Sequence, residues 1–191
     1  MKILISIQTL AVGGAQTFAI RLSNALSLDH KVYLYIHNPR GSGNDLMSLV
    51  SERVEVHQMV LNPVLDWFAW KINRIITLFV KEFSFHDFLN GRYFRYFLLN
   101  KKPDLINSHM IGSDQFVAKY SQNIPWVISM HGCYETGLSS EKDFALRAED
   151  ILNQADALIY AADKNLDILR AINSKRLLLN RRKIYYGIND E

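Results

Sequence analysis

Short apolar runs alternate with helical patterns along this chain, and that alternation limits the folds it can adopt more than any other feature. Runs with strand character begin at Met1, Lys31, Val54, Leu105, Trp126 and Ala157, and a short last strand is expected over Lys183 to Tyr186. Helical patterns cover residues 16–28, 45–51, 65–100, 112–121, 140–153 and 163–172. Strands and helices that alternate in this way form a parallel sheet with helices on both faces. The sequence therefore predicts a Rossmann-like α/β fold in a single domain.

Glycine or polar residues follow nearly every predicted strand. Gly13 and Gly14 follow the first strand, His109 ends the fourth, and His131 with Gly132 follows the fifth. The carboxyl ends of parallel strands share one edge of the sheet, and ligands bind there, near the point at which the strand order reverses. A glycine turn that leads into a helix also presents free backbone N–H groups to an anion. We therefore expect a ligand site at this edge, with a simple turn as the alternative for the two glycines.

Composition narrows the class of protein. The chain has 191 residues, of which 49% are hydrophobic and 21% charged, as in an ordinary globular domain. Its net charge of +3 is too small to indicate nucleic acid. The single cysteine, Cys133, excludes an internal disulfide and suits a reducing compartment. Ser6, Gln8 and Thr9 interrupt the first apolar run, which argues against a secretory signal, and no window has the roughly 18 to 20 continuous apolar residues of a membrane span.

Three motifs, in their order along the chain, resemble the amino-terminal half of glycosyltransferase family 4. Members of that family are two-domain, retaining, nucleotide-sugar-dependent enzymes of the GT-B architecture. Their first loop commonly reads Gly-Gly-Ala/Met-Glu, and residues 13–16 here read Gly-Gly-Ala-Gln. Their fifth strand often ends in a His-Gly pair, as at His131 and Gly132. The phrase that closes their first domain is echoed by Tyr-Tyr-Gly-Ile-Asn over residues 185–189, so the resemblance covers essentially the whole chain.

This resemblance implies roles for the residues of the predicted site. The first loop would lie against the donor diphosphate and the acceptor, and consists of Gly13, Gly14, Ala15 and Gln16. His131 would be the catalytic contact to the donor sugar, and His109, Gly132 and Glu135 would contact the acceptor or the sugar. Preorganised N–H donors stabilise negative charge on a departing phosphate, and a histidine can donate a hydrogen bond or a proton near neutral pH. The alternative for His131 is a buried, hydrogen-bonded histidine without a functional role.

Two departures from the family pattern affect this interpretation. Gln16 stands where the family usually has a glutamate, which removes a charge near the acceptor. The family also binds its donor mainly through a second domain with paired glutamates, and the present sequence ends at the linker to that domain. We therefore interpret residues 1–186 as the amino-terminal glycosyltransferase domain and residues 187–191 as the start of the interdomain linker, with the carboxyl-terminal donor-binding domain absent.

By the resemblance, the chain is the acceptor-side domain of a hexosyltransferase. The whole enzyme would transfer a sugar from a nucleotide-diphosphate sugar to a glycan or lipid-linked acceptor in cell-surface polysaccharide synthesis, and this chain alone would be inactive. The alternative is a non-catalytic binding module, or one subunit of a split enzyme with a separate donor-binding chain. The expected location is the cytoplasm, with peripheral contact to the cytoplasmic face of the membrane.

Reactive side chains near His131 suggest a further chemistry that the sequence supports less well. Cys133 and Glu135 lie two and four residues beyond that histidine. A thiol nucleophile needs an orienting group as well as a base, and no third residue of that kind is evident. Glu135 is better interpreted as an acceptor contact. No set of His, Cys, Asp or Glu residues has the spacing of a metal site, so neither a metal nor another cofactor is expected.

The segment from Trp67 to Lys102 is unusually aromatic and basic, with eleven aromatic residues and with seven basic residues against two acidic ones. At about 100° per residue, one helical face is expected to pack on the sheet and consists of Phe68, Ile72, Ile75, Ile76, Phe79 and Phe83. The membrane-facing residues would be Trp67, Trp70, Lys71, Arg74 and Lys81. Tryptophans among cations are typical of a helix that lies on an anionic membrane. The alternatives are packing of the tryptophans under residues 83–99 and a nucleic-acid surface, for which no single-strand platform is recognised.

Overall fold

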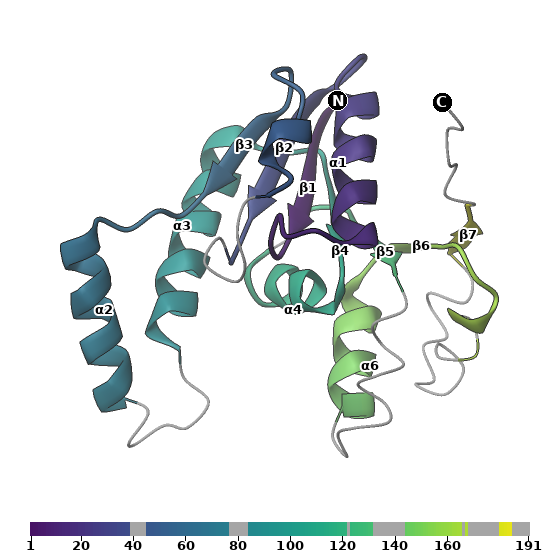
Figure 1. The fold of residues 1–191 in the computed structure, drawn as a ribbon. Coiled ribbons are helices and arrows are strands. Elements are labelled where there is room, and N and C mark those ends of the chain that lie inside the picture. Colours follow the sequence, from purple (N-terminus) through teal and green to yellow (C-terminus); the bar gives the residue numbers. More distant parts are fainter. Residues whose placement is uncertain are drawn as a thin grey trace.

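In the computed structural model of this protein, residues 1–38, 45–76, 84–121, 123–131, 144–165, 167 and 180–184 are described. One sheet contains seven parallel strands in the order β3-β2-β1-β4-β5-β6-β7. The strands are β1 (Lys2–Ile7), β2 (Lys31–Ile36), β3 (Glu55–Gln58), β4 (Leu105–His109), β5 (Trp126–Met130), β6 (Ala157–Tyr160) and β7 (Arg181–Lys183). The helices are α1 (Gly14–Leu26), α2 (Pro63–Ile76), α3 (Phe85–Lys101), α4 (Ile111–Tyr120) and α6 (Phe144–Gln154), with a 3-10 turn at Met47–Leu49 (Figure 1).

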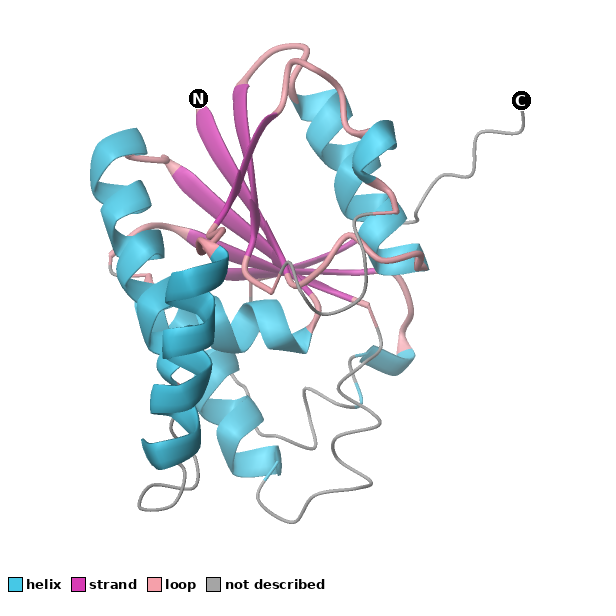
Figure 2. Cartoon of the chain, turned by 60° about the vertical axis from the view of Figure 1, so that its left-hand side comes forward, coloured by secondary structure: helices cyan, strands magenta, loops and turns pink. Residues whose placement is uncertain are grey.

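Both faces of the central strands are buried, as continuous apolar strands of a parallel sheet require. On one face Ile3, Ile5 and Ile7 of β1 join the core residues of α1. On the other face Leu4 belongs to a larger core that α3, α4 and α6 complete. Figure 2 shows helices on both sides of the twisted sheet. The prediction of a Rossmann-like parallel sheet with helices on both faces is therefore confirmed.

The predicted helical segment over residues 65–100 contains two helices, α2 and α3. A new helix begins at α3 because Ser84 caps it: the Ser84 hydroxyl accepts a hydrogen bond from the backbone N–H of Asp87 at 3.2 Å. At its other end Lys102 adopts a left-handed conformation with φ of 49°, which ends the helix before Pro103. Both ends of α3 are set by local capping, which the spacing of hydrophobic residues does not predict.

Other boundaries differ from the sequence prediction at the ends of elements. The short helix expected over residues 45–51 is a single 3-10 turn. The last strand, expected from residue 183, begins two residues earlier and is Arg181–Lys183, whereas residues 185 and 186 lie outside the described residues. The predicted helix over residues 163–172 falls mostly outside the described residues. So do the Tyr-Tyr-Gly-Ile-Asn motif and the expected linker at residues 187–191.

Helix α2 packs against α3 and not on the sheet, so the prediction for its apolar face is wrong. Phe68 and Ile75, expected to be buried, are 52% and 60% exposed. Ala69 is the buried residue of α2, and its small side chain allows the close approach to α3. Trp67 and Trp70 are about half exposed, so the following segment does not cover them. Phe79, Lys81 and Phe83 lie outside the described residues.

Candidate functional site

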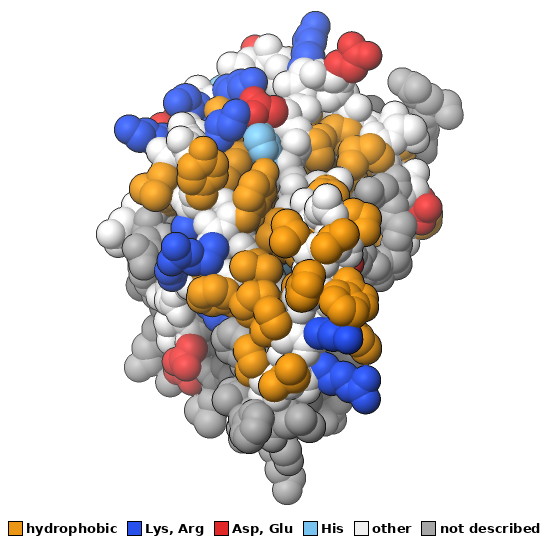
Figure 3. Space-filling view, turned by 90° about the vertical axis from the view of Figure 1, so that its left-hand side faces the viewer, with side chains coloured by type: hydrophobic (Ala, Val, Ile, Leu, Met, Phe, Trp, Pro, Cys, Tyr) orange, Lys and Arg blue, Asp and Glu red, His pale blue; other side chains and the backbone are white. Residues whose placement is uncertain are grey.

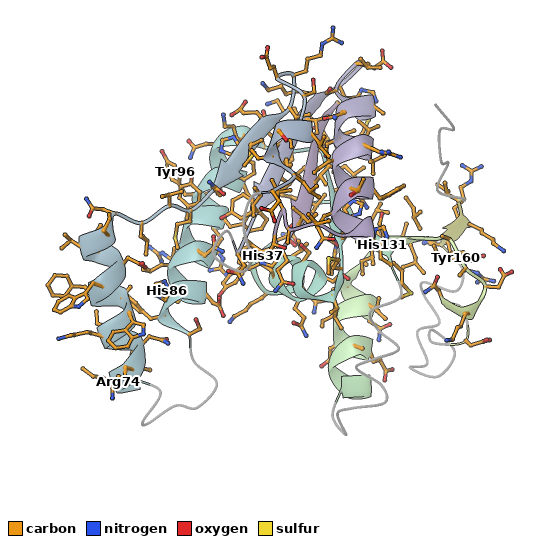
Figure 4. The ribbon with its side chains drawn as sticks, viewed as in Figure 1. His37, Arg74, His86, Tyr96, His131 and Tyr160 are labelled. Atoms are coloured by element: carbon orange, nitrogen blue, oxygen red, sulfur yellow. The ribbon has the colours of Figure 1, made fainter. Side chains whose placement is uncertain are left out.

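The strand order reverses at β1, which pairs with β2 on one side and with β4 on the other. Ile7, at the carboxyl end of β1, is level with Ile36 of β2 and with His109 of β4. Open parallel sheets bind ligands outside the strand carboxyl ends at such a reversal. In the view of Figure 4, His37 and His131 lie on either side of α4.

His109 and His131 form a contacting pair at this edge. His109 is level with Ser129 in the β4–β5 register, and His131 lies two residues beyond Ser129, so both side chains leave the sheet on the same side. The nitrogens His109 Nδ1 and His131 Nε2 lie 2.9 Å apart. The two rings stack with centroids 5.2 Å apart. The sequence predicted both residues for the site but not the bond between them.

Phe18 of α1 connects this histidine pair to the glycine turn. Its ring centroid lies 5.8 Å from that of His109 and 5.3 Å from that of His131. Phe18 stands four residues after Gly14, so it extends from the second turn of the helix that the glycine turn begins. Sequence reasoning missed Phe18 as a site residue. The available signal was its position one helical turn after the glycine loop.

Burial keeps both imidazoles neutral at physiological pH. His109 is fully buried, and burial together with the neighbouring His131 holds its pKa well below the usual value of 6.5. Burial also lowers the pKa of His131, to about 4. A neutral imidazole donates or accepts a hydrogen bond but carries no charge. The structure therefore gives His131 the properties of a hydrogen-bonding group at pH 7 and not those of a cationic acid.

The glycine loop is closed by a side chain of its own helix. The Gln16 side chain folds back over Gly13, so closely that a Cβ atom on Gly13 would lie 2.4 Å from Gln16 Oε1. Gln16 is buried in this position. A Cβ atom on Gly14, in contrast, would meet nothing within 4 Å. Gly13 therefore makes room for Gln16, whereas the space in front of Gly14, at the amino end of α1, stays open.

Helix α4 begins at this edge through a strained backbone. Met110, between His109 and α4, has φ of 74° and ψ of 148°, a conformation that non-glycine residues rarely adopt. The backbone N–H groups of Ser113 and Asp114 both donate to the Met110 carbonyl oxygen at 3.0 Å and hold it in place. This arrangement turns the chain sharply after β4 and aims the amino end of α4 at the site.

A cavity of about 360 Å³ opens beside the start of α4, lined by Gln8, His37, Asn38, Asp87, Gly112, Gln115, Phe116, Lys119 and Tyr120. The His37 ring stacks on Phe116 with centroids 4.6 Å apart, and His37 Nε2 lies 3.0 Å from Ser113 Oγ. Burial lowers the pKa of His37 to about 3. The amide, carboxylate and ammonium groups of this lining can form hydrogen bonds with a polyhydroxylated ring, and the aromatic side chains can stack on it. The sequence analysis did not identify this cavity, because its residues come from the segments that follow β1 and β2 and from α3 and α4.

Other sequence predictions concern residues or features outside this arrangement. Gly132, Cys133 and Glu135 lie outside the described residues, and their roles remain predictions. Within the described ranges, no group of three or more His, Cys, Asp or Glu side chains is placed to hold a metal ion. None of the described helices combines the length and the apolar character needed to cross a membrane. A larger cavity, of about 700 Å³, lies at the amino ends of β5 and β6, away from the histidine pair.

Comparison with known proteins relates this arrangement to one family. The family model described as Glycosyltransferase Family 4 matches residues 12–179. Comparison with curated proteins found no match. Among solved structures, the chain is similar to HepE of Anabaena in complex with UDP, with 16% identity and a TM-score of 0.66 over 98% of this chain and 44% of that one.

Two further structures show the same fold. Sucrose-phosphate synthase of Thermosynechococcus elongatus has 15% identity and a TM-score of 0.66, covering 98% of this chain and 48% of that one. The lipopolysaccharide outer core galactosyltransferase WaaB, in its apo form, has 14% identity and a TM-score of 0.61, covering 100% of this chain and 47% of that one. The chain thus spans less than half the length of each of these three structures.

Proposed function

This chain belongs to glycosyltransferase family 4, and we propose that it forms the acceptor-side half of a retaining hexosyltransferase. The donor would be a nucleotide-diphosphate sugar and the acceptor a glycan or a lipid-linked glycan of a cell-surface polysaccharide. One observation carries this proposal. The amino end of α1 is open at Gly14, and Phe18 of the same helix contacts the pair of His109 and His131. A site that can bind an anion and a group that can hydrogen-bond a sugar therefore lie side by side at one edge of the sheet.

Each part of this edge would have a distinct role in transfer. The bond between the sugar and the diphosphate breaks, and negative charge grows on the departing phosphate oxygen. The amino end of α1 would stabilise that charge through its backbone N–H groups and its dipole. His131, neutral at pH 7, would donate or accept a hydrogen bond at the sugar, and His109 would orient its ring. The oxygen of the acceptor hydroxyl would bond to the anomeric carbon of the sugar, and the proton of that hydroxyl would pass to the departing phosphate.

The cavity beside His37 would hold the acceptor. It opens at the same carboxyl edge as the histidine pair, and its lining combines aromatic rings with amides, a carboxylate and a lysine. We propose that transfer needs no metal ion, because the α1 amino end would supply the stabilisation of the diphosphate, together with the donor-binding half. A cytoplasmic location suits both a nucleotide-sugar substrate and the single cysteine.

Gly14 offers a sharp test of the anion site. A Cβ atom fits there without contact, so Gly14→Asp and Gly14→Asn are both compatible with the fold. The two side chains have nearly the same shape and differ in charge. With UDP-glucose as the probe, we expect NMR titration of the chain to show weak binding, with amide shifts at Gly13 and Gly14. Gly14→Asp should weaken that binding about tenfold relative to Gly14→Asn, because a carboxylate would face the diphosphate. Equal binding by both variants would contradict the proposed anion site.

Turnover tests the half-site assignment separately. We expect these 191 residues alone to release almost no UDP from UDP-glucose, since the donor-binding half would supply most donor contacts. Product formation by the isolated chain, measured with an acceptor glycan and in the presence of a chelator, would show that the site is complete and would refute this part of the proposal.

A further inference from the structure

Helix α2 turns its polar residues toward the protein. The Asn73 side-chain oxygen accepts a hydrogen bond from the backbone N–H of Phe85 at 2.8 Å. Asp66 lies 3.9 Å from His86, which Figure 4 shows between α2 and α3. Ala69, between these two positions on the helix, is 2% exposed. Residues 66, 69 and 73 therefore form the face that packs on α3.

The opposite side of α2 carries large apolar side chains, and we call it the outer face: Val64, Trp67, Phe68, Lys71 and Ile75. Residues 64, 68, 71 and 75 follow one another at helical spacing, about 180° from the face that packs on α3. Val64, Trp67, Phe68 and Ile75 are between 51% and 62% exposed. Figure 3 shows hydrophobic side chains gathered on this side of the molecule, with lysines and arginines at their edge. An amphipathic helix of a globular domain normally has the reverse arrangement.

One cation lies on the outer face and a second lies at its edge. The Lys71 ammonium lies over the Trp67 ring, 4.1 Å from its centroid. The Arg74 guanidinium lies 5.7 Å from the centroid of the Trp70 ring, which is beside the outer face. Asp66, the acidic residue of α2, faces α3 instead. The outer face is thus apolar and positively charged.

We propose that the outer face of α2 binds the protein to the surface of a bilayer that contains anionic lipids. Apolar side chains of this kind enter the boundary between headgroups and acyl chains, tryptophan rings settle at the interface, and cations on long stems reach lipid phosphates. Each arginine or lysine near an anionic surface strengthens binding. The outer face supplies all three kinds of group on one helix.

The shape and chemistry of the outer face favour a bilayer over other occupants. A single helix that stands out from the sheet presents a convex surface, and a fluid bilayer adapts to it without a matching groove. A second protein chain would need a surface of matching shape to reach the packing density of a stable interface. Nucleic acid would need a surface dominated by cations, whereas here four apolar residues surround one lysine on the outer face.

The position of α2 relates the proposed membrane contact to the cavity for the acceptor. His86, which contacts α2, is followed in sequence by Asp87, which lines the cavity beside His37. The outer face points away from α3, so a lipid-linked acceptor held in a bilayer there would have to extend past α2 and α3 to reach that cavity. This last step rests on the proposed function, whereas binding of the bilayer does not.

Tryptophan fluorescence tests the proposal directly. The chain has three tryptophans: Trp67 and Trp70 are on α2, and Trp126 is 3% exposed in the core. A change of emission on binding therefore reports α2. With vesicles of phosphatidylcholine and phosphatidylglycerol, we expect the full chain to bind, its emission to shift to the blue, and lipids brominated in the acyl chain to quench it. Binding without a blue shift, or equal binding to pure phosphatidylcholine vesicles, would overturn the proposal.

Variants separate the outer face from general hydrophobicity. Phe68→Ser with Ile75→Ser keeps both reporter tryptophans and should weaken vesicle binding about tenfold or more, because two apolar side chains that would enter the bilayer are lost. Lys71→Gln with Arg74→Gln should weaken it roughly 25-fold, about fivefold per cation. The control, Leu28→Ser with Leu99→Ser, removes two leucines elsewhere that are 66% and 73% exposed, at least as much as Phe68 and Ile75, and should leave binding unchanged.

Thermal unfolding of each variant confirms that it is folded before binding is compared. Unchanged binding by the Phe68 and Ile75 double variant would overturn the proposal. So would concentration-dependent self-association that this double variant abolishes while the parent chain ignores vesicles, since the outer face would then bind a second copy. UDP-glucose binding by the chain is measured apart from vesicles, so failure of the lipid proposal and failure of the proposed function are distinguishable.

Discussion

The ring nitrogens His109 Nδ1 and His131 Nε2 lie 2.9 Å apart at the carboxyl ends of adjacent strands. Both imidazoles are neutral at pH 7, so one of them donates the shared proton and the other accepts it. Within the described part of the chain, His109 Nε2 is buried without a hydrogen-bond partner. The state of that nitrogen decides the direction of the bond.

We predict that His109 carries its proton on Nδ1 and donates to His131. The other tautomer would leave a buried N–H without an acceptor, which is rarer in proteins than an unpaired acceptor. Nitrogen-15 chemical shifts of the imidazole rings, assigned through long-range proton couplings, distinguish the two tautomers. A His109 proton on Nε2 would reverse the direction of the bond and remove the orienting role proposed for His109.

A second prediction is that stability falls on acidification through the pH range of an ordinary histidine. In the folded chain the pKa values of His37 and His131 are about 3 and 4, and that of His109 is also lowered, whereas in the unfolded chain each is near 6.5. Above pH 6.5 these histidines are neutral in both the folded and the unfolded chain, so their titration takes nothing from the free energy of unfolding. As the pH falls from 6.5 toward the folded values, the unfolded state takes up protons and the folded state does not.

Urea unfolding at about pH 7.5 and about pH 5 measures this effect. His37 alone should contribute up to roughly 2 kcal/mol of the loss at pH 5, at about 1.4 kcal/mol per pH unit. His37→Gln retains a hydrogen-bonding group for Ser113 and should flatten the pH dependence by that amount. Glu55 does not interfere, because its hydrogen bond from Lys101 lowers its pKa to about 2 and it stays ionised throughout. An unchanged slope in the variant would show that His37 is not protected from protons.

A third prediction concerns the packing of α3 on α4. A Cβ atom on Gly91 would lie 2.1 to 2.6 Å from carbon atoms of the Tyr120 ring, which is itself buried. We expect Gly91→Ala to reduce the free energy of unfolding by about 1 to 3 kcal/mol through overpacking. The control is Gly14→Ala, where a Cβ atom meets nothing and alanine favours the helix. Chemical denaturation of both variants tests this, and similar stabilities would contradict the close packing at Gly91.

The fourth prediction concerns the hydrogen bonds that connect Tyr35 through Asn90 to the backbone of His37. The buried hydroxyl of Tyr35 donates to the side-chain oxygen of Asn90 at 2.7 Å, and the Asn90 amide in turn donates to the carbonyl oxygen of His37. Tyr35→Phe should cost about 1 to 3 kcal/mol because Asn90 keeps a buried acceptor without its donor. Tyr96→Phe removes the same hydroxyl from a residue that is 65% exposed and should cost almost nothing. Equal denaturation midpoints for the two variants would refute the role of this bond.

The sequence by itself determined the architecture and the edge at which the site lies. Apolar runs such as KILISI and WVISM, separated by helical patterns, leave few folds besides a parallel sheet covered on both faces. In such a sheet every strand ends at one edge, so residues that follow strands, including Gly14, His109 and His131, must gather there. Local order along the chain carried this information, and no contact between distant residues was needed.

Only the tertiary structure decided which of these residues touch and which way α2 faces. The bond between His109 and His131 depends on the register of β4 with β5, and the position of Phe18 depends on how α1 crosses the sheet. For α2, apolar residues occupy most of the helix surface, so its period is compatible with either face being buried. Packing on α3 through Ala69 and Asn73 settled this, because only a small residue and a hydrogen-bonding one fit against that helix, and the large apolar side chains were left outside.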